Sequence, residues 1–253
     1  LKNFNQKKKI KVVWDAGNGS AGKIMKKLAN KIYGEKIILF DEINGNFPNH
    51  HPDPSDSNNL IDCQTNILDN NLDIGLAFDG DGDRLGVIDD LGRVISGDKI
   101  LLLLAKELLK KKKIKVIADV KCSQVLFDEV KKMGGEIIMS QTGHSHVKNN
   151  LKKFKADLAG EMSGHIFFAD NYYGFDDALY AAVKMLEIVN DNEKKLSELV
   201  DEIPLLYNTP EIRIDCEDEA KFGIIKEVLT NIKNTNNDFI SIDGVRVMNE
   251  EGW

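Results

Sequence analysis

Short apolar runs alternate with longer segments of helical spacing along most of this chain. The short runs predict strands, and apolar residues at every third or fourth position between them predict helices. The predicted strands are 11–14, 37–40, 74–78, 85–88, 93–95, 115–120, 137–139, 157–159 and 166–169, and the predicted helices are 21–33, 60–68, 100–110, 125–133, 146–154 and 178–190. Alternation of this kind is typical of parallel sheets with helices on their faces.

Part of this pattern occurs twice. Lys11–Asp15 (KVVWD) matches Lys115–Asp119 (KVIAD), and a strand that ends in an acidic, glycine-containing loop occurs at 76–81 and again at 158–162. We therefore expect an α/β fold with two similar domains, each a mixed, mostly parallel sheet with helices on its faces, followed by a truncated third α+β unit. The expected bounds of these units are 1–95, 96–206 and 207–253.

Composition narrows the class of protein. Of the 253 residues, 42% are apolar and 30% are charged, which suits a globular protein long enough to bury a core. The longest apolar run, 100–105, is far shorter than the roughly 20 residues of a membrane-spanning helix, so a membrane span is excluded. The formal net charge of −7 argues against a general nucleic-acid partner.

Cysteines and chain ends add two expectations. Cys63, Cys122 and Cys216 are widely spaced and form no CxxC pair, which fits a reducing compartment and neither a disulfide framework nor a zinc site. No secretory signal precedes the first predicted strand, so we expect a cytoplasmic location. Because the sequence opens on Leu1 and stops at Trp253, just after a strand-like stretch, we expect a piece of a longer protein.

A glycine-rich turn follows the first predicted strand. Residues 17–22 fit GxGxxG, and Asp41 stands at the end of the next predicted strand. This is the layout in which backbone N–H groups bind a pyrophosphate and an acid binds a ribose hydroxyl. A P-loop would need a hydroxyl where Ile24 stands. The turn by itself leaves open an NAD-binding oxidoreductase and a tight strand-to-helix turn without a ligand.

The most specific motif is the loop 79–84 (DGDGDR), which directly follows an apolar predicted strand. Its three carboxylates can converge on one cation only if the backbone curls tightly, and the two intervening glycines permit that curl. Without a cation these anions would repel one another. Carboxylate ligands favour Mg²⁺, Mn²⁺ or Ca²⁺ over zinc. Arg84 supports a phosphate-bearing ligand, because a guanidinium can bind two phosphate oxygens.

Other acidic motifs fit this loop less well. An EF-hand would need glycine at Arg84 and flanking helices, and a haloacid-dehalogenase-type phosphatase would have threonine or valine at Asp83. A polar surface turn is the alternative without function.

The loop Gly-Glu-Met-Ser-Gly-His stands at the equivalent place in the second repeat. Its Glu161, Ser163 and His165 are donors and acceptors of the kind that bind sugar hydroxyls. A nucleophilic serine is an alternative, but no oxyanion hole accompanies it. Lys121 and His144 follow other predicted strands of this repeat, at the ends where open α/β sheets place ligands. Each histidine could equally be a structural turn residue.

Together these motifs resemble the α-D-phosphohexomutase superfamily, in particular the bacterial phosphomannomutase/phosphoglucomutase group. The resemblance runs in order through nearly the whole chain and implies domains two and three, and the start of domain four, of a four-domain enzyme. It displaces the dinucleotide interpretation, because the same glycine cluster opens the second domain of these enzymes. The family's phosphoserine loop (Thr-Ala-Ser-His-Asn-Pro) and phosphate loop (Arg-x-Ser-Asn-Thr) do not occur in this sequence. The matching stretches are 15–19, 46–54, 79–84, 142–145, 160–165 and 174–177.

The resemblance implies a Mg²⁺-dependent isomerase that interconverts hexose 1-phosphate and hexose 6-phosphate, of glucose or mannose, through a phosphoserine and a hexose 1,6-bisphosphate. Without the serine loop, this chain alone is expected to be inactive. A non-enzymatic module that binds metal or sugar phosphate is the alternative. The implied residues are Asp79, Asp81 and Asp83 for Mg²⁺, Arg84 for the transferring phosphoryl group, Glu161 and Ser163 for sugar hydroxyls, and His144, His165 and Lys121 for other substrate contacts.

Overall fold

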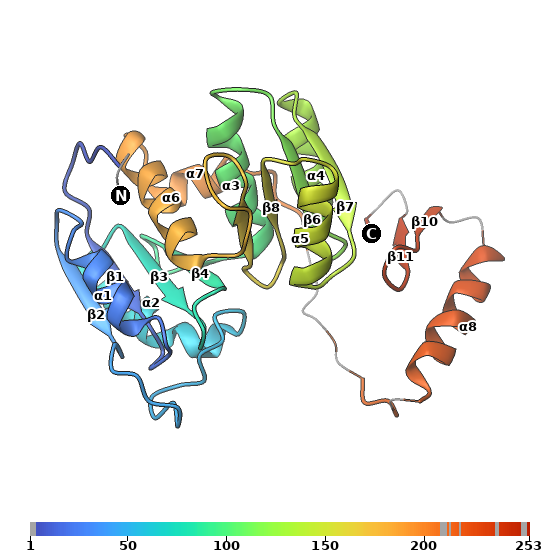
Figure 1. Cartoon of the computed structure of the whole chain (residues 1–253), viewed down its shortest axis with the longest axis horizontal. Coiled ribbons are helices and arrows are strands. Elements are labelled where there is room, and N and C mark those ends of the chain that lie inside the picture. Colours follow the sequence, from blue (N-terminus) through green and yellow to red (C-terminus); the bar gives the residue numbers. More distant parts are fainter. Residues whose placement is uncertain (1–3, 208–211, 213, 218, 236–237, 249–251) are drawn as a thin grey trace.

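Two helix-covered sheets lie side by side and a smaller unit follows them in the computed structural model (Figure 1). The structure describes residues 4–207, 212, 214–217, 219–235, 238–248 and 252–253. Both large sheets are mixed and mostly flanked by helices, which confirms the predicted fold class of two similar α/β domains.

The first sheet has three parallel strands and an antiparallel hairpin at one side. The central strands are buried on both faces because every residue of β1 and β3 is apolar, glycine or a terminal acid. On one face the ring of Trp14 stacks against that of Phe78, and on the other Val13 packs against Ile67 of α2. The strands are β1 (Val12–Asp15), β2 (Lys36–Leu39), β3 (Ile74–Phe78), β4 (Leu85–Asp89) and β5 (Val94–Ile95), in the order β2-β1-β3-β4-β5. The helices of this part are α1 (Gly22–Ala29), the short 3₁₀ helix η1 (Ser57–Leu60) and α2 (Ile61–Asn70).

The second sheet repeats the strand order of the first. Its first three strands are parallel and the fourth is antiparallel, so β7, β6, β8 and β9 correspond to β2, β1, β3 and β4. The two matching sequences therefore form the same strand in each sheet, as the repeat predicts. The strands are β6 (Lys115–Asp119), β7 (Glu136–Ser140), β8 (Leu158–Gly160) and β9 (Ile166–Phe168), with helices α4 (Gln124–Lys132) and α5 (His144–Lys153) on opposite faces.

Two long helices join the sheets into one apolar core. Helix α3 (Gly97–Leu109) packs against α4 and β8 of the second sheet. Helix α6 (Ala178–Asp191) follows the second sheet in sequence but packs against α3 and against β4 of the first sheet (Figure 1). At the end of α6, Asn190 accepts a hydrogen bond from the backbone N–H of Lys7 and donates one to the carbonyl of Asn5. The short helix α7 (Leu196–Asp201) packs beside α3.

Two helix starts differ from the prediction. Helix α3 begins at Gly97 and α5 at His144, each earlier than the apolar spacing indicates. The reason is that the first turns are polar: Asp98, for example, accepts hydrogen bonds from the backbone N–H groups of Lys99 and Ser123. Polar first turns carry no apolar periodicity, so the pattern detects only the later turns.

The third unit contains a helix and a small sheet. Helix α8 (Lys221–Lys233) is followed by an antiparallel pair, β10 (Asp238–Ile240) and β11 (Arg246–Met248). The predicted α+β character is thus confirmed, and the strand-like stretch near the end of the sequence contains β11. Part of the predicted start of this unit, at 208–211, lies outside the described residues. Among the residues described, no helix combines the length and apolar character that crossing a bilayer requires.

Candidate metal and sugar-phosphate site

The acidic loop after β3 is organised around its first residue. Oδ1 of Asp79 accepts hydrogen bonds from the backbone N–H groups of Gly82, Asp83 and Arg84, each at 3.0 Å. Its Oδ2 accepts one from Nε of Arg84 at 2.8 Å. Asp79 thus closes the loop into a tight turn.

Electrostatics keep Asp79 ionised. Burial works to raise the pKa of this carboxyl, but the backbone N–H and guanidinium of Arg84 outweigh burial and hold its pKa below the ordinary value. Nη1 of Arg84 also lies 3.1 Å from Oδ1 of Asp53, which comes from the loop between β2 and η1. Arg84 therefore contacts two carboxylates from separate parts of the first unit.

The other two aspartates of the loop have raised pKa values. Burial and the neighbouring carboxylates raise the pKa of Asp81, and burial together with Asp79 and Asp81 raises that of Asp83 to about 6 against the opposing effect of His165. One carboxylate oxygen from each of Asp79, Asp81 and Asp83 lies within 4.8 Å of the others. Three converging carboxylates, two of them with raised pKa values, fit a hard divalent cation such as Mg²⁺.

Glu161, in the loop between β8 and β9, contacts a backbone N–H group and a histidine ring. Oε1 of Glu161 accepts a hydrogen bond from the backbone N–H of Gly143 at 2.6 Å, and its Oε2 lies 3.2 Å from Nδ1 of His165. Burial works to raise the pKa of Glu161, but His165 and the Gly143 N–H outweigh it and lower the pKa. Oγ of Ser163 lies 3.0 Å from the same His165 nitrogen. Glu161 and Ser163 thus both contact His165, the first by an ion pair and the second by a hydrogen bond.

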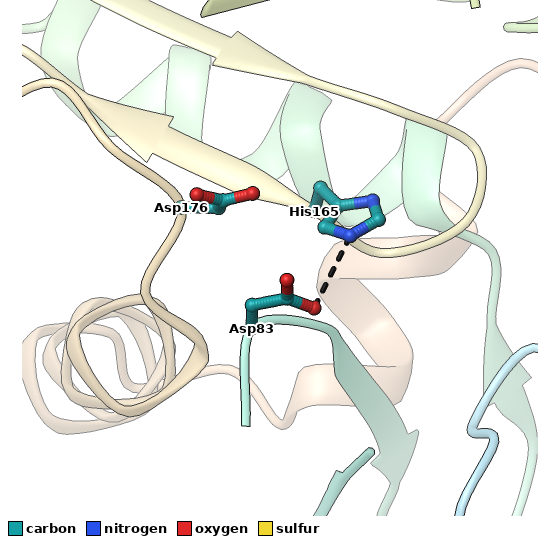
Figure 2. Close-up of side chains that lie close together, drawn as sticks. All are labelled: Asp83, His165 and Asp176. Atoms are coloured by element: carbon teal, nitrogen blue, oxygen red, sulfur yellow. Dashed lines mark ion pairs between the residues drawn. The ribbon is translucent and has the colours of Figure 1, made fainter. Parts of the chain in front are cut away.

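A backbone bridge joins this cluster to the acidic loop. Arg84 and His165 pair in antiparallel register, and the backbone N–H of Leu85 donates to the carbonyl of Gly164 at 3.1 Å. As a result, Nε2 of His165 lies 3.2 Å from Oδ1 of Asp83 (Figure 2). Burial works to lower the pKa of His165, but the carboxylates of Glu161 and Asp83 outweigh burial and raise it.

Asp176 and His144 complete the cluster. Figure 2 shows Asp176 facing His165 and Asp83, and their ligand atoms lie within 4.8 Å of one another. Oδ2 of Asp176 lies 3.5 Å from Nδ1 of His144. The His144 ring, in the first turn of α5, stacks on the His165 ring at a centroid distance of 5.6 Å.

The glycine-rich turn after β1 packs against the acidic loop. The N–H of Ser20 donates to the carbonyl of Gly80 at 2.8 Å, and a Cβ added to Gly19 would lie 2.8 Å from that oxygen. A Cβ on Gly22 would lie 2.4 Å from the carbonyl of Asp41, whose side chain pairs with Lys26. These glycines serve close packing, and the acid that a dinucleotide ribose would need is already paired. The geometry therefore disfavours the NAD-binding alternative.

Family models match both large units in order. Residues 1–92 match "Phosphoglucomutase/phosphomannomutase, alpha/beta/alpha domain II", and residues 96–207 match domain III of the same family. The chain belongs to the phosphoglucomutase/phosphomannomutase family. The order of the two matches agrees with the order of the acidic loop at 79–84 and the loop at 160–165 (below, the sugar-type loop, after its predicted ligand) along this chain.

Several family members resemble the chain over nearly its whole length. A phosphomannomutase/phosphoglucomutase of Pseudomonas putida is 44% identical over 97% of this chain and 53% of the relative, and a phosphoglucomutase of Neisseria gonorrhoeae is 42% identical over 98% and 54%. A solved phosphoglucomutase/phosphomannomutase family protein from Burkholderia thailandensis has a TM-score of 0.90 and 40% identity, covering 98% of this chain and 53% of that one. The chain thus spans about half the length of the relatives it matches.

Lys121, another predicted site residue, lies on the second unit. It is exposed and directly follows β6, at the same edge of the second sheet from which Glu161 emerges after β8. The other predicted residues of this family site gather around the bridge. They are Asp79, Asp81, Asp83 and Arg84 on the acidic loop, and His144, Glu161, Ser163 and His165 on the second unit.

Sequence reasoning assigned no role to three acids at this site. Asp53 pairs with Arg84, Asp176 faces His165, and Asp119 at the end of β6 accepts a hydrogen bond from the backbone N–H of Met162. Asp53 and Asp176 lie inside stretches that match the family, which is the only signal that marks them. Asp119 is buried, and the internal repeat marks it, because it holds the same place at the end of β6 as Asp15 holds at the end of β1.

Gly164→Ala should weaken the connection between the two units. Gly164 has φ +97°, and an added Cβ would lie 2.7 Å from the carbonyl of Leu85. We expect the variant to lose about 2 kcal/mol of unfolding free energy, because strained left-handed backbone and the steric clash add together. Urea denaturation measures this loss. Gly134→Ala is the control for strain alone, since Gly134 has φ +81° but open space around its Cβ position. Equal losses in the two variants would contradict the proposed contact.

His50→Gln should lower stability most at acidic pH. The hydrogen bond from His50 Nε2 to the buried carboxylate of Asp15, at 3.1 Å, raises the pKa of His50. A pKa that is higher in the folded state stabilises the fold fully below about pH 6.5 and no longer does so as the pH rises through the folded value. The difference in urea midpoint between the variant and the wild-type chain should therefore shrink from pH 6 to pH 9. A difference that grows with pH would contradict this pairing.

Proposed function

We propose that this chain supplies the metal- and sugar-binding part of a cytoplasmic phosphohexomutase that interconverts the 1-phosphate and 6-phosphate of glucose or mannose. The observation that carries the proposal is the backbone bridge between Arg84 and His165. It brings a carboxylate cluster suited to a divalent cation next to a cluster suited to sugar hydroxyls. Transfer of a phosphoryl group on a sugar needs both at one place.

Asp79, Asp81 and Asp83 would hold Mg²⁺ in this proposal. When bound, the ion would act as a Lewis acid that offsets negative charge on the transferring phosphoryl group. Arg84 is held beside the acidic loop by Asp79 and Asp53, so its positive charge would add to this effect.

The second unit would orient the sugar. Glu161 and Ser163 would bind sugar hydroxyls, while His144, His165 and Lys121 would contact the substrate through groups that donate hydrogen bonds to phosphate or hydroxyl oxygens. The stacking of His144 on His165 places both rings on the same side of the bridge.

The proposed reaction follows the family scheme of a phosphoserine donor and a hexose 1,6-bisphosphate intermediate. The serine oxygen gives its phosphoryl group to the sugar, and the sugar's other phosphoryl group later returns to the serine, so phosphate is conserved. The Thr-Ala-Ser-His-Asn-Pro stretch does not occur in this sequence. The serine would therefore come from outside these 253 residues, and we expect the chain alone to show no turnover.

Calorimetry on the full 253-residue chain tests this proposal. We expect Mg²⁺ to bind the wild-type chain and to bind the Asp83→Asn variant much more weakly, and glucose 1-phosphate or mannose 1-phosphate to bind more tightly when Mg²⁺ is present. NAD serves as the comparison ligand. Binding of NAD without binding of either sugar phosphate would overturn the proposal in favour of an oxidoreductase.

A coupled assay for glucose 6-phosphate, run with glucose 1-phosphate and glucose 1,6-bisphosphate, tests the source of the serine. Turnover by the chain alone would show that the phosphoryl donor lies within these residues or is not needed. No turnover despite sugar-phosphate binding is the expected result.

A further inference from the structure

Arg246 of β11 reaches from the third unit into the second. Its side chain is buried, and Nη1 donates hydrogen bonds to the carbonyl of Val120 at 2.6 Å and to the carbonyl of Cys122 at 2.7 Å. These two carbonyls stand on either side of Lys121. A single nitrogen therefore fixes the backbone before and after that residue.

The guanidinium is held between two rings. Its central carbon lies 5.8 Å from the ring centroid of Phe127 on α4 and 5.0 Å from that of Trp253. Nη2 is 3.3 Å from Oε1 of Gln124. No carboxylate in the described part of the chain forms an ion pair with Arg246, so the backbone carbonyls are its closest polar partners. A buried cation whose charge faces carbonyls is costly to place unless those hydrogen bonds are made.

A second residue of the third unit, three positions before Arg246, also contacts the second unit. Oδ2 of Asp243 accepts a hydrogen bond from the backbone N–H of Thr142 at 2.9 Å. Thr142 precedes Gly143, whose own N–H is bound by Glu161. Asp243 and Arg246 therefore contact the loops that follow β7 and β6; the first loop leads into His144 and the second contains Lys121, both candidate substrate residues.

Asp119 links the segment around Lys121 to the sugar-type loop. Asp119 accepts a hydrogen bond from Sγ of Cys122 at 2.8 Å and one from the backbone N–H of Met162 at 3.3 Å. The segment from Val120 to Cys122 is thus held by hydrogen bonds to both Arg246 and Asp119.

We propose that Arg246 is a positioning residue that sets the direction of the Lys121 side chain toward a sugar phosphate. This inference rests on the proposed function of Lys121. Hydrogen bonds to the carbonyls of Val120 and Cys122 restrict the backbone conformation between them, and so restrict the direction of the Cα–Cβ bond of Lys121. Docking of the third unit and binding of the sugar phosphate at Lys121 then strengthen each other, since coupling between two sites is reciprocal.

A double-mutant cycle on the full chain tests whether Arg246 acts through Lys121. Arg246→Met keeps a long apolar stem between the two rings but removes the donors, and Lys121→Met removes the proposed ligand. We expect each single variant to bind glucose 1-phosphate about tenfold more weakly, and the double variant to bind no more weakly than Lys121→Met alone. Losses that multiply in the double variant would overturn the proposal, because Arg246 would then act on something other than Lys121.

Hydrogen exchange of the backbone amides at 120–124 gives a readout that needs no sugar phosphate. We expect exchange there to accelerate about tenfold in Arg246→Met and less in Arg246→Lys, which keeps a charged donor. Exchange in β1 should stay unchanged and so report intact folding. Unchanged exchange at 120–124 would overturn the positioning role. If the wild-type chain binds no sugar phosphate, the proposed function fails, and the exchange experiment alone then decides whether Arg246 holds this loop.

Discussion

Asp79→Asn should destabilise the metal-free chain by about 3 kcal/mol and abolish Mg²⁺ binding. The carboxylate of Asp79 is buried, accepts three backbone hydrogen bonds and pairs with Arg84. An amide keeps the shape but loses the charge, which weakens those charge-assisted bonds and leaves Arg84 with one partner fewer. Urea denaturation in the presence of EDTA measures the change in unfolding free energy, and calorimetry measures the affinity for Mg²⁺.

Asp81→Asn is the matched control for that result. Asp81 is largely exposed, but partial desolvation and the charge of Asp79 raise its pKa, so its ionised form opposes folding at pH 7. Neutralising it should leave the metal-free chain as stable as wild type or more stable, yet still weaken Mg²⁺ binding. Equal destabilisation by both variants would contradict the distinct roles that we assign to the two aspartates.

Mg²⁺ should bind about tenfold more weakly at pH 5 than at pH 7. The pKa of Asp83 is raised to about 6 in the metal-free chain, mainly by burial and by the other two aspartates. Below that pH a proton occupies the carboxylate and competes with the cation, so the apparent affinity falls by about a factor of ten per pH unit. Calorimetry across this range, repeated in buffers of different ionisation enthalpy, measures both the affinity and the proton released on binding.

His165→Gln should move this pH dependence upward. The positive charge of His165, 3.2 Å from Asp83, lowers the pKa of that carboxyl, so removing it should raise the pKa further. The variant should then lose Mg²⁺ affinity at a higher pH than wild type does. An affinity that stays constant from pH 5 to pH 7 in the wild-type chain would contradict Asp83 as a ligand.

The sheets could be predicted from sequence because their central strands are continuous apolar runs with a repeated pattern. The KVVWD and KVIAD stretches become β1 and β6, which hold the same place in their sheets. The position of α6 could not be predicted. Its apolar spacing shows that one face of the helix is buried, but such spacing does not tell which sheet that face packs against. In the structure the helix packs on β4 of the first unit.

The candidate site was predictable only where its residues stand close together in sequence. The three aspartates of loop 79–84 could be predicted as a metal site because they alternate with glycines in the sequence. In the structure, the Arg84–His165 bridge brings the sugar-type loop beside them. Asp53, Asp176 and Arg246 reach their partners by loops or by packing between units, and such contacts leave no local pattern.

The path of α6 has a consequence for how the chain acquires its structure during synthesis. Strand β4 and the segment around Lys7 are made early, yet the helix that covers β4 and binds Lys7 at Asn190 is made only after the whole second sheet. Until that helix has been synthesised, the apolar surface of β4 that it covers stays exposed to solvent. A cut in the chain between the two sheets would leave β4 and the helix that covers it on different fragments, so the two fragments should not fold independently.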